Sequence, residues 1–390
     1  MRDRRFAFVL VSAVASGTER RMAFVYRHLC RRFPGRYRLM LTPYLFEVLN
    51  RGGYALDSLP GVDLLPPPYR HDHKRSADVS PLRNLARLVS LRDYRQSMQD
   101  LARRGEVDVF HVYLEMVPFL ALFPLTGIPT ITSMVTHLPK YFDRRTVACR
   151  LLLRATRQSP KTDCVYSYIA ERLAQAGAEA AKLNYPYRNT VNHEAFHPEA
   201  KELAVSFTAR ALRFKNPHVM LRVIAKVLRA HPTVRIFLHG AGPMLKALAH
   251  EVQLRGWSDR IRTGHIADPS VVVNRSLVHT ALEAYDNAPN QSLLEGMAAG
   301  CAVVASDVGL TSEVVTPDVG RLTSLDPEEI AEAVIALLDK PAEAKAMGTA
   351  ARERILRDHH VDRYLAYLEQ VHDLDDPRPV IAGVRAGGPP

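Results

Sequence analysis

The segment from Asp286 to Gly309 reads DNAPNQSLLEGMAAGCAVVASDVG and contains the clearest signs of the fold. Pro289 stands where a helix can start, the residues after it supply an apolar face, and Gly300 suits the left-handed conformation that ends many helices. This pattern predicts a short helix over residues 291–299. The next residues, 301–305, form a continuous apolar run, which is typical of a strand buried on both faces of a parallel sheet.

A helix and strand in this order place polar groups where ligands bind in α/β proteins. Ligands of open parallel sheets lie beyond the carboxyl ends of the strands. The unpaired N–H groups near Pro289 and Gln291 are therefore candidates to bind phosphate oxygens, because helix N-termini attract anions. Glu295, one turn into the helix, is a candidate to bind ribose hydroxyls.

The same alternation of strands and helices extends over most of the chain and predicts an α/β fold with two Rossmann-like domains. At 390 residues the chain is also too long for one ordinary core. Strands are expected over residues 5–14, 38–42, 107–112, 130–135, 204–208, 234–239, 261–263, 277–284 and 301–305. Closing helices are expected over residues 327–338, 342–357 and 361–371.

The domain limits follow from changes in composition. Residues 184–200 contain prolines, asparagines and histidines with little periodicity, which indicates a linker. The predicted division is an N-terminal Rossmann-like domain over 1–183, the linker 184–200, a C-terminal Rossmann-like domain over 201–357, a closing helix over 358–374 that packs back on the N-terminal domain, and a loose tail over 375–390.

Composition favours a globular protein of a reducing compartment. Hydrophobic residues make up 47% of the chain and charged residues 24%. The four cysteines fall singly, without the spacing of a metal site or a disulfide framework, which predicts a cytoplasmic protein. The basic and apolar residues 2–15 also resemble a short signal peptide, which is the alternative to a first strand. Later apolar runs are broken by proline, so no transmembrane span is expected.

Positive charge is concentrated in the first half of the chain. The formal net charge is +11, and residues 1–180 hold 28 Lys and Arg against 16 Asp and Glu. This balance favours an anionic partner, such as a membrane surface to which the chain binds peripherally, or simply a solvated basic surface. The expected helix over residues 82–104 is basic and amphipathic and fits either reading. A nucleic-acid partner is not expected, because interleaved aromatics and a known module are missing.

Two cations follow one strand of the second half. Arg210 ends that strand, and Lys215 comes five residues later in the loop. Together they would neutralise a diphosphate leaving group, Arg210 through its planar fork and Lys215 as a point charge. After the next strand, residues 239–243 (HGAGP) make a glycine turn into a helix, again at a carboxyl end.

In this order and spacing, the parts resemble the group 1 family of retaining GT-B glycosyltransferases, also called family four. The similarity covers residues 190–370 well and residues 1–140 loosely. The matching pieces are SGTER at 16–20, FTAR at 207–210 with Lys215, HGAGP at 239–243, LLEGMAAGCAVVASDVG at 293–309, EVV at 313–315 and KPAEAKAMGTAARERI at 340–355.

The resemblance implies two Rossmann-like domains facing across a cleft. It implies a nucleotide diphosphate sugar donor on the second domain, an acceptor on the first that is a glycan, lipid-linked or small molecule, and retaining transfer without a metal or other cofactor. The donor-binding residues that it implies are Gly17, Arg210, Lys215, Gly240, Gly242, Ala288, Pro289, Asn290, Gln291 and Glu295. The catalytic residues that it implies are His137 and Asp286, with Arg210 and Lys215.

The chain departs from the family pattern at two of these catalytic residues, Asp286 and His137. Eight residues separate Asp286 and Glu295, where the family has seven and begins with glutamate. His137 lies two residues later after Pro129 than the pattern expects, so His111 is a second candidate for the family's inward histidine. Two alternatives accompany the transferase hypothesis: a nucleotide-sugar epimerase on the same fold, and a catalytically weak binding or scaffold subunit.

Overall fold

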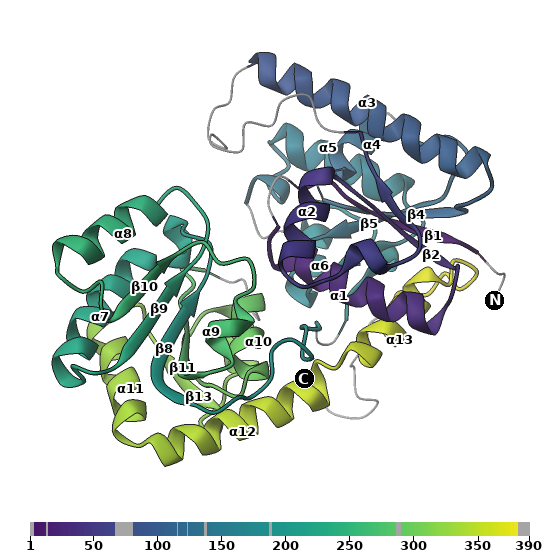
Figure 1. Cartoon of the computed structure of the whole chain (residues 1–390). Coiled ribbons are helices and arrows are strands. Elements are labelled where there is room, and N and C mark those ends of the chain that lie inside the picture. Colours follow the sequence, from purple (N-terminus) through teal and green to yellow (C-terminus); the bar gives the residue numbers. More distant parts are fainter. Residues whose placement is uncertain are drawn as a thin grey trace. The chain divides into compact units, whose positions relative to one another are not determined.

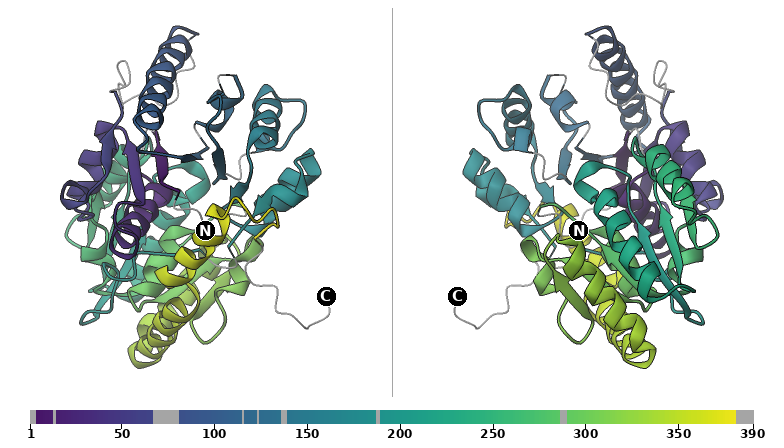
Figure 2. Two further views of the ribbon diagram at one scale, coloured as in Figure 1. Left: turned by 90° about the vertical axis from the view of Figure 1, so that its right-hand side faces the viewer. Right: turned by 90° about the vertical axis from the view of Figure 1, so that its left-hand side faces the viewer.

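A computed structural model describes residues 4–12, 15–66, 81–114, 116–122, 124–135, 139–186, 189–285 and 290–380 of the chain. The chain forms two compact units. Unit 1 comprises Met1–Asn189 and Val361–Pro390, and unit 2 comprises Thr190–His360. Each unit has its own parallel sheet with helices on both faces (Figures 1 and 2).

The sheet of unit 1 has the strand order β3-β2-β1-β4-β5-β6-β7. Its strands are β1 (Phe6–Leu10), β2 (Tyr37–Leu41), β3 (Val62–Leu64), β4 (Val109–Tyr113), β5 (Thr130–Met134), β6 (Thr162–Cys164) and β7 (Leu183–Asn184). Its helices are α1 (Gly17–Arg32), α2 (Pro43–Arg51), α3 (Pro81–Arg103), α4 (Val117–Leu122), α5 (Val147–Gln158), α6 (Ser167–Ala176) and α13 (Val361–His372). The apolar run that also resembles a signal peptide is thus β1, a central strand of this sheet.

Strand β1 shows why both faces of this sheet are covered. Phe6 and Phe8 point to the core that α1, α2 and α13 cover, whereas Ala7 and Val9 point to the core under α3, α4, α5 and α6. All five residues of β1 are buried. Alternate residues of a strand face opposite sides, so an uninterrupted apolar run requires helices on both faces.

The sheet of unit 2 has the order β10-β9-β8-β11-β12-β13. Its strands are β8 (Glu202–Thr208), β9 (Arg235–His239), β10 (Ile261–Gly264), β11 (Ser276–Ala281), β12 (Ala302–Ser306) and β13 (Gly320–Thr323). Its helices are α7 (Pro217–Ala230), α8 (Leu245–Leu254), α9 (Ser270–Val273), α10 (Gln291–Ala298), α11 (Pro327–Asp339) and α12 (Pro341–Asp358). Helices α7, α8 and α11 cover one core, and α9, α10 and the end of α12 cover the other.

The boundary between the units differs from the expected linker. The sequence predicted a linker over 184–200, but Val191 and Phe196 are buried in a core of unit 2. Polar, proline-rich sequence without periodicity marks irregular backbone, and irregular backbone can still be buried. The chain returns to unit 1 at Val361, where α13 packs on α1 and Arg32 pairs with Glu369 at 3.3 Å.

Strands with short or polar sequences were missed. The first-half prediction has four strands, and β3, β6 and β7 are absent from it. In the second half β13 is absent, and residues 277–284 were predicted as one strand although β11 ends at Ala281. Runs of two to four residues carry too little periodicity to be recognised. Within the described residues, no helix combines the length and apolar character needed to cross a membrane.

A buried polar network fastens α13 to the sheet of unit 1. The carboxylate of Asp163, on β6, accepts hydrogen bonds from Tyr367 (2.5 Å) and Ser133 (2.7 Å). His111 on β4 lies 3.5 Å from this carboxylate, and its Nδ1 is 3.0 Å from Nε2 of His372. Burial alone would raise the pKa of Asp163, but His111, through its charge and hydrogen bonding, together with the hydrogen bonds from Tyr367 and Ser133, outweighs burial and the pKa is lowered. The network therefore stabilises the ionised carboxylate.

Acid should destabilise unit 1 through His372. Burial, together with the nearby charge of His111, lowers the pKa of His372 well below its ordinary value. The folded chain then holds this imidazole neutral, so stability is full above about pH 6.5 and falls as the pH drops towards the folded pKa. The expected loss is about 1.4 kcal/mol per pH unit for this one group. Urea unfolding of the wild type and His372→Gln at pH 7 and pH 5.5 measures it.

The substitution His372→Gln should reduce the pH dependence of unfolding, because glutamine does not titrate. His250→Gln is the control, since His250 is exposed on α8. Equal pH dependence in the wild type and His372→Gln would show that His372 does not contribute to the acid sensitivity.

Candidate functional site

The candidate site lies in unit 2, beyond the carboxyl ends of β8, β9, β11 and β12. Four segments meet at this edge: the loop after β8, the turn after β9, the residues after β11 and the start of α10. The carboxyl edge is where ligands of open α/β sheets bind. The geometry of each segment follows from its local sequence.

The loop after β8 presents the two predicted cations. Arg210 is exposed, and its guanidinium carbon lies 5.9 Å from the ring centre of Phe214. Lys215 ends a short 3-10 helix, η4 (Arg213–Lys215). Asn216 follows in the left-handed conformation, with φ 53°, and turns the chain into α7. Asparagine tolerates this conformation better than most residues do.

Lys215 is paired with a carboxylate that the sequence prediction omitted. Its ammonium forms a salt bridge with Oε1 of Glu283, which follows β11, and the two side chains are only 12% and 6% exposed. Burial lowers the pKa of Lys215, while the charge of Glu283 opposes that shift and Arg210 adds to it. The loops after β8 and β11 therefore bring the cations Arg210 and Lys215 close to the buried carboxylate of Glu283.

The two glycines after β9 allow two loops to approach closely. A Cβ on Gly240 would lie 1.9 Å from the carbonyl oxygen of Ala209, and one on Gly242 would lie 2.7 Å from that of Ala211. Ala211 donates its N–H to the carbonyl of Ala241 at 2.8 Å, which ties the loops together. Gly240 and Gly242 thus fix the position of the Arg210 loop.

The start of α10 is held at the end of β8 by hydrogen bonds. Asn290 caps the helix by accepting from the N–H of Leu293 at 2.8 Å. The hydroxyl of Ser292 donates to the carbonyl of Thr208 at 2.6 Å. The amino end of α10, which begins at Gln291, therefore lies beside the strand that leads to Arg210. The N–H groups at this end have no partner within the helix and attract negative charge.

The buried side chain of His279 contacts Ser292 and so helps to hold the start of α10. Nε2 of His279, on β11, lies 3.0 Å from the Ser292 hydroxyl, and Nδ1 lies 2.9 Å from the hydroxyl of Ser206. Because Ser292 already donates to Thr208, we assign the imidazole proton to Nε2. Burial lowers the pKa of His279 to about 3, so the ring stays neutral at ordinary pH.

Gly296 lets α10 lie directly on His279. A Cβ at this position would be 2.4 Å from Cδ2 of the imidazole ring, closer than any real contact. Any side chain on residue 296 would push the helix away from β11. Glu295, the preceding residue, is 1% exposed in the second turn of α10.

Several predicted site residues lie elsewhere or outside the described residues. Asp286, Ala288 and Pro289 fall in the segment 286–289, and His137 falls in 136–138, neither of which the structure describes. Gly17 begins α1 in unit 1, after a capping box in which Glu19 accepts from the N–H of Ser16 at 2.7 Å.

His111, the second candidate for the inward histidine, lies in the interior of unit 1. His111 is fully buried and belongs to the network that fastens α13 to unit 1. It lies within β4, whereas the carboxyl end of that strand is Tyr113. As the chain folds here, its imidazole supports packing and is not at the sheet edge.

Most of unit 2 is similar to a known protein family. A family model described as glycosyl transferases group 1 matches residues 190–354, which is nearly all of unit 2. This match covers less than half of the chain. The site described above lies within the matched residues.

The similarity to curated proteins extends over a limited part of the chain. A D-inositol 3-phosphate glycosyltransferase of Corynebacterium diphtheriae is 31% identical over 160 residues, which are 38% of this chain and 37% of that protein. The protein of the same name from Segniliparus rotundus is 26% identical over 160 residues, with 39% and 36% covered. The chain thus matches little more than a third of the length of these relatives.

The fold of the whole chain has solved counterparts. The Anabaena protein HepE, crystallised in complex with UDP and glucose, aligns with a TM-score of 0.73 and 16% identity over 95% of this chain and 100% of that chain. At this identity the likeness shows the fold alone. That fold is GT-B, with two Rossmann-like α/β domains, as the sequence predicted.

Glu283 is a charged residue of the site that the sequence interpretation missed. It fell inside the strand predicted over residues 277–284, where a glutamate has no assigned role. A charged residue at the end of an otherwise apolar run was the available signal, because strands buried on both faces rarely hold an unpaired carboxylate. The early end of β11 moves Glu283 into the edge loop.

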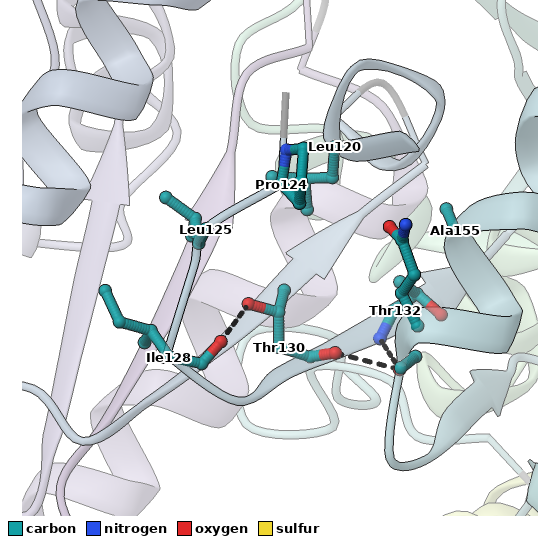
Figure 3. A pocket seen from close by; sticks show the side chains of 9 residues that line it. Leu120, Pro124, Leu125, Ile128, Thr130, Thr132 and Ala155 are labelled. Atoms are coloured by element: carbon teal, nitrogen blue, oxygen red, sulfur yellow. Dashed lines mark hydrogen bonds between the residues drawn. The ribbon is translucent and has the colours of Figure 1, made fainter. Parts of the chain in front are cut away.

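Unit 1 has a pocket near the amino end of β5. It is lined by Leu120, Pro124, Leu125, Ile128, Thr130, Thr132, Ala155, Gln158 and Ser159 (Figure 3). The hydroxyl of Ser159 donates to the carbonyl of Thr130 at 2.8 Å and accepts from the N–H of Thr132 at 3.2 Å. These hydrogen bonds occupy the Ser159 hydroxyl and the backbone groups of Thr130 and Thr132. Among the described residues, no group of three or more His, Cys, Asp and Glu side chains is placed to hold a metal.

Proposed function

We propose that the protein is a glycosyltransferase that moves a sugar from a nucleoside diphosphate sugar to an acceptor hydroxyl. The observation that carries this proposal is the meeting of Arg210, Lys215 and the amino end of α10 at one sheet edge, inside the part of the chain that matches the group 1 family. The glycosyltransferase relatives and the UDP and glucose bound by HepE support a nucleotide-sugar donor.

The chemistry requires stabilisation of a departing diphosphate. Arg210 would bind its oxygens through a planar fork, Lys215 would add a point charge, and the N–H groups of α10 would contribute the helix dipole. Preorganised charges of this kind are the largest single contribution in many enzymes. Because protein groups supply this positive charge, we propose that transfer requires neither a metal ion nor another cofactor.

The remaining assignments belong to the same proposal. Transfer retains the anomeric configuration, and the acceptor is a glycan, a lipid-linked sugar or a small molecule. Glu295 binds the ribose, and His137 and Asp286 act near the transferred sugar. The backbone of Ala288, Pro289, Asn290 and Gln291 contacts the phosphates, and Gly17 allows the loop of unit 1 to approach the donor.

We also propose a cytoplasmic location, with contact to an anionic membrane surface through unit 1. Within α3, Tyr94 and Met98 are buried in the core of unit 1 and Arg92 is exposed, which leaves a positive charge on the surface of the helix. Sedimentation with vesicles rich in anionic phospholipid at low salt tests this contact. A chain that stays in the supernatant would contradict it.

The function is tested by incubating the chain with a panel of nucleotide sugars and candidate acceptors. Release of a nucleoside diphosphate that depends on the acceptor, with retention seen by NMR of the product, is the expected result. Interconversion of the donor without an acceptor would establish an epimerase instead. Donor binding without turnover over the whole panel would establish a binding subunit.

A further inference from the structure

Glu283 and the residue after it contact two neighbouring segments at the carboxyl edge of the sheet of unit 2. Its carboxylate pairs with the ammonium of Lys215 across the gap between the loops after β8 and β11. Its own N–H donates to the hydroxyl of Ser306, at the end of β12, at 2.8 Å. The next residue, Ala284, donates its N–H to the carbonyl of Phe214 at 3.0 Å.

These contacts fix the backbone on each side of the ion pair. Residue 283 is anchored to β12, and residue 284 is anchored to η4, one residue before Lys215. Both side chains are almost wholly enclosed, at 12% and 6% exposure. Removing one partner of a buried ion pair is strongly destabilising, because the other charge is left unpaired. The pair is therefore a fixed part of the edge rather than a mobile surface contact.

The charges around Lys215 indicate what the Glu283 carboxylate does. Lys215 faces Arg210 from its own loop and Glu283 from the segment after β11. Burial and the neighbouring guanidinium both favour the neutral amine, which cannot bind a diphosphate as a cation. Glu283 is the group that opposes them.

We propose that Glu283 is a positioning residue of the donor site, which holds the Lys215 ammonium charged and in place and leaves Arg210 as the excess positive charge. This proposal rests on the proposed function, since it assumes that a diphosphate binds at this edge. Glu283 need not contact the diphosphate itself. It acts through Lys215, so removing its charge should weaken diphosphate binding only when Lys215 is present.

The substitution Glu283→Gln tests this role. It keeps the shape of the side chain but removes its charge. Binding of UDP, ADP and GDP is measured by calorimetry, and KM and kcat are measured with the corresponding nucleotide sugars. We expect a weaker Kd for the nucleoside diphosphate by about tenfold, a matching rise in donor KM and a smaller change in kcat.

The pH profile separates positioning from a merely structural role. In Glu283→Gln, Lys215 should lose its proton at a lower pH than in the wild type, so the alkaline fall in diphosphate binding should move to lower pH. Glu202→Gln is the matched control, because Glu202 pairs with Arg235 and Arg275 at the amino end of β8. That variant should bind and turn over as the wild type does.

A double-mutant cycle keeps the proposal testable if folding is affected. In a Lys215→Met background, Glu283→Gln should cause no further loss of diphosphate binding, and Glu283→Asp should retain part of the wild-type affinity. Unchanged or tighter binding in Glu283→Gln would overturn the proposal, and tighter binding would mean that the carboxylate competes with the diphosphate. Absence of binding by the wild type would overturn the proposed function itself.

Discussion

Replacing Arg210 with alanine is expected to lower kcat/KM for the nucleotide sugar by about 10²–10³, or about 3–4 kcal/mol of transition-state stabilisation. Arg210 is exposed and forms no ion pair with a described residue. Its removal therefore leaves no buried charge without a partner, and the fold should keep its stability. Steady-state kinetics with the preferred donor, beside thermal unfolding, measures both expectations.

The control for this substitution lies in the same loop. Arg213 is exposed in η4, three residues from Arg210, and carries the same charge. If Arg210 acts by its position, Arg213→Ala should stay within about twofold of the wild type, a surface effect of a few tenths of a kcal/mol. Equal losses in the two variants would show that only the general charge of the loop matters. No loss in Arg210→Ala would remove Arg210 from the site.

Replacing Gly296 with alanine is expected to destabilise unit 2 and weaken donor binding together. The added methyl group would lie 2.4 Å from the ring of His279, so α10 must move away from β11. Overpacking of this kind costs about 1–3 kcal/mol, which lowers the melting temperature by several degrees in a unit of this size. Thermal unfolding with and without a nucleoside diphosphate measures the two effects.

The direction of this result is informative because helix propensity predicts the opposite. Alanine in place of glycine within a helix ordinarily stabilises by about 1 kcal/mol. A higher melting temperature in Gly296→Ala would contradict the close contact between α10 and His279. An unchanged affinity with a lower melting temperature would mean that the position of α10 does not control donor binding.

The sequence predicted the parts of the fold that are periodic and local. The helix expected over 291–299 is α10, over Gln291–Ala298, and the strand expected over 301–305 is β12, over Ala302–Ser306. Proline, glycine and a continuous apolar run act on neighbouring residues, so these elements can be recognised without the rest of the chain.

Other features depended on residues distant in the sequence. Strand β6 has a buried aspartate at its centre, and its partner Tyr367 is 204 residues away. Nothing local to Asp163 marks it as buried. The same applies to Glu283 and Lys215, whose ion pair joins residues 68 apart. Motif spacing indicated Arg210 and Lys215, but the carboxylate of Glu283 that pairs with Lys215 became visible only in the folded chain.

A donor site at the carboxyl edge of β8 can be tested by hydrogen–deuterium exchange with and without the nucleoside diphosphate that binds best. We expect slower exchange with the nucleotide in three segments of unit 2: residues 209–216, residues 239–243 and the first turns of α10. We also expect that Arg210→Ala loses this protection at the same nucleotide concentration. Protection confined to unit 1, or no protection in these segments despite binding, would contradict a donor site at the carboxyl edge of β8.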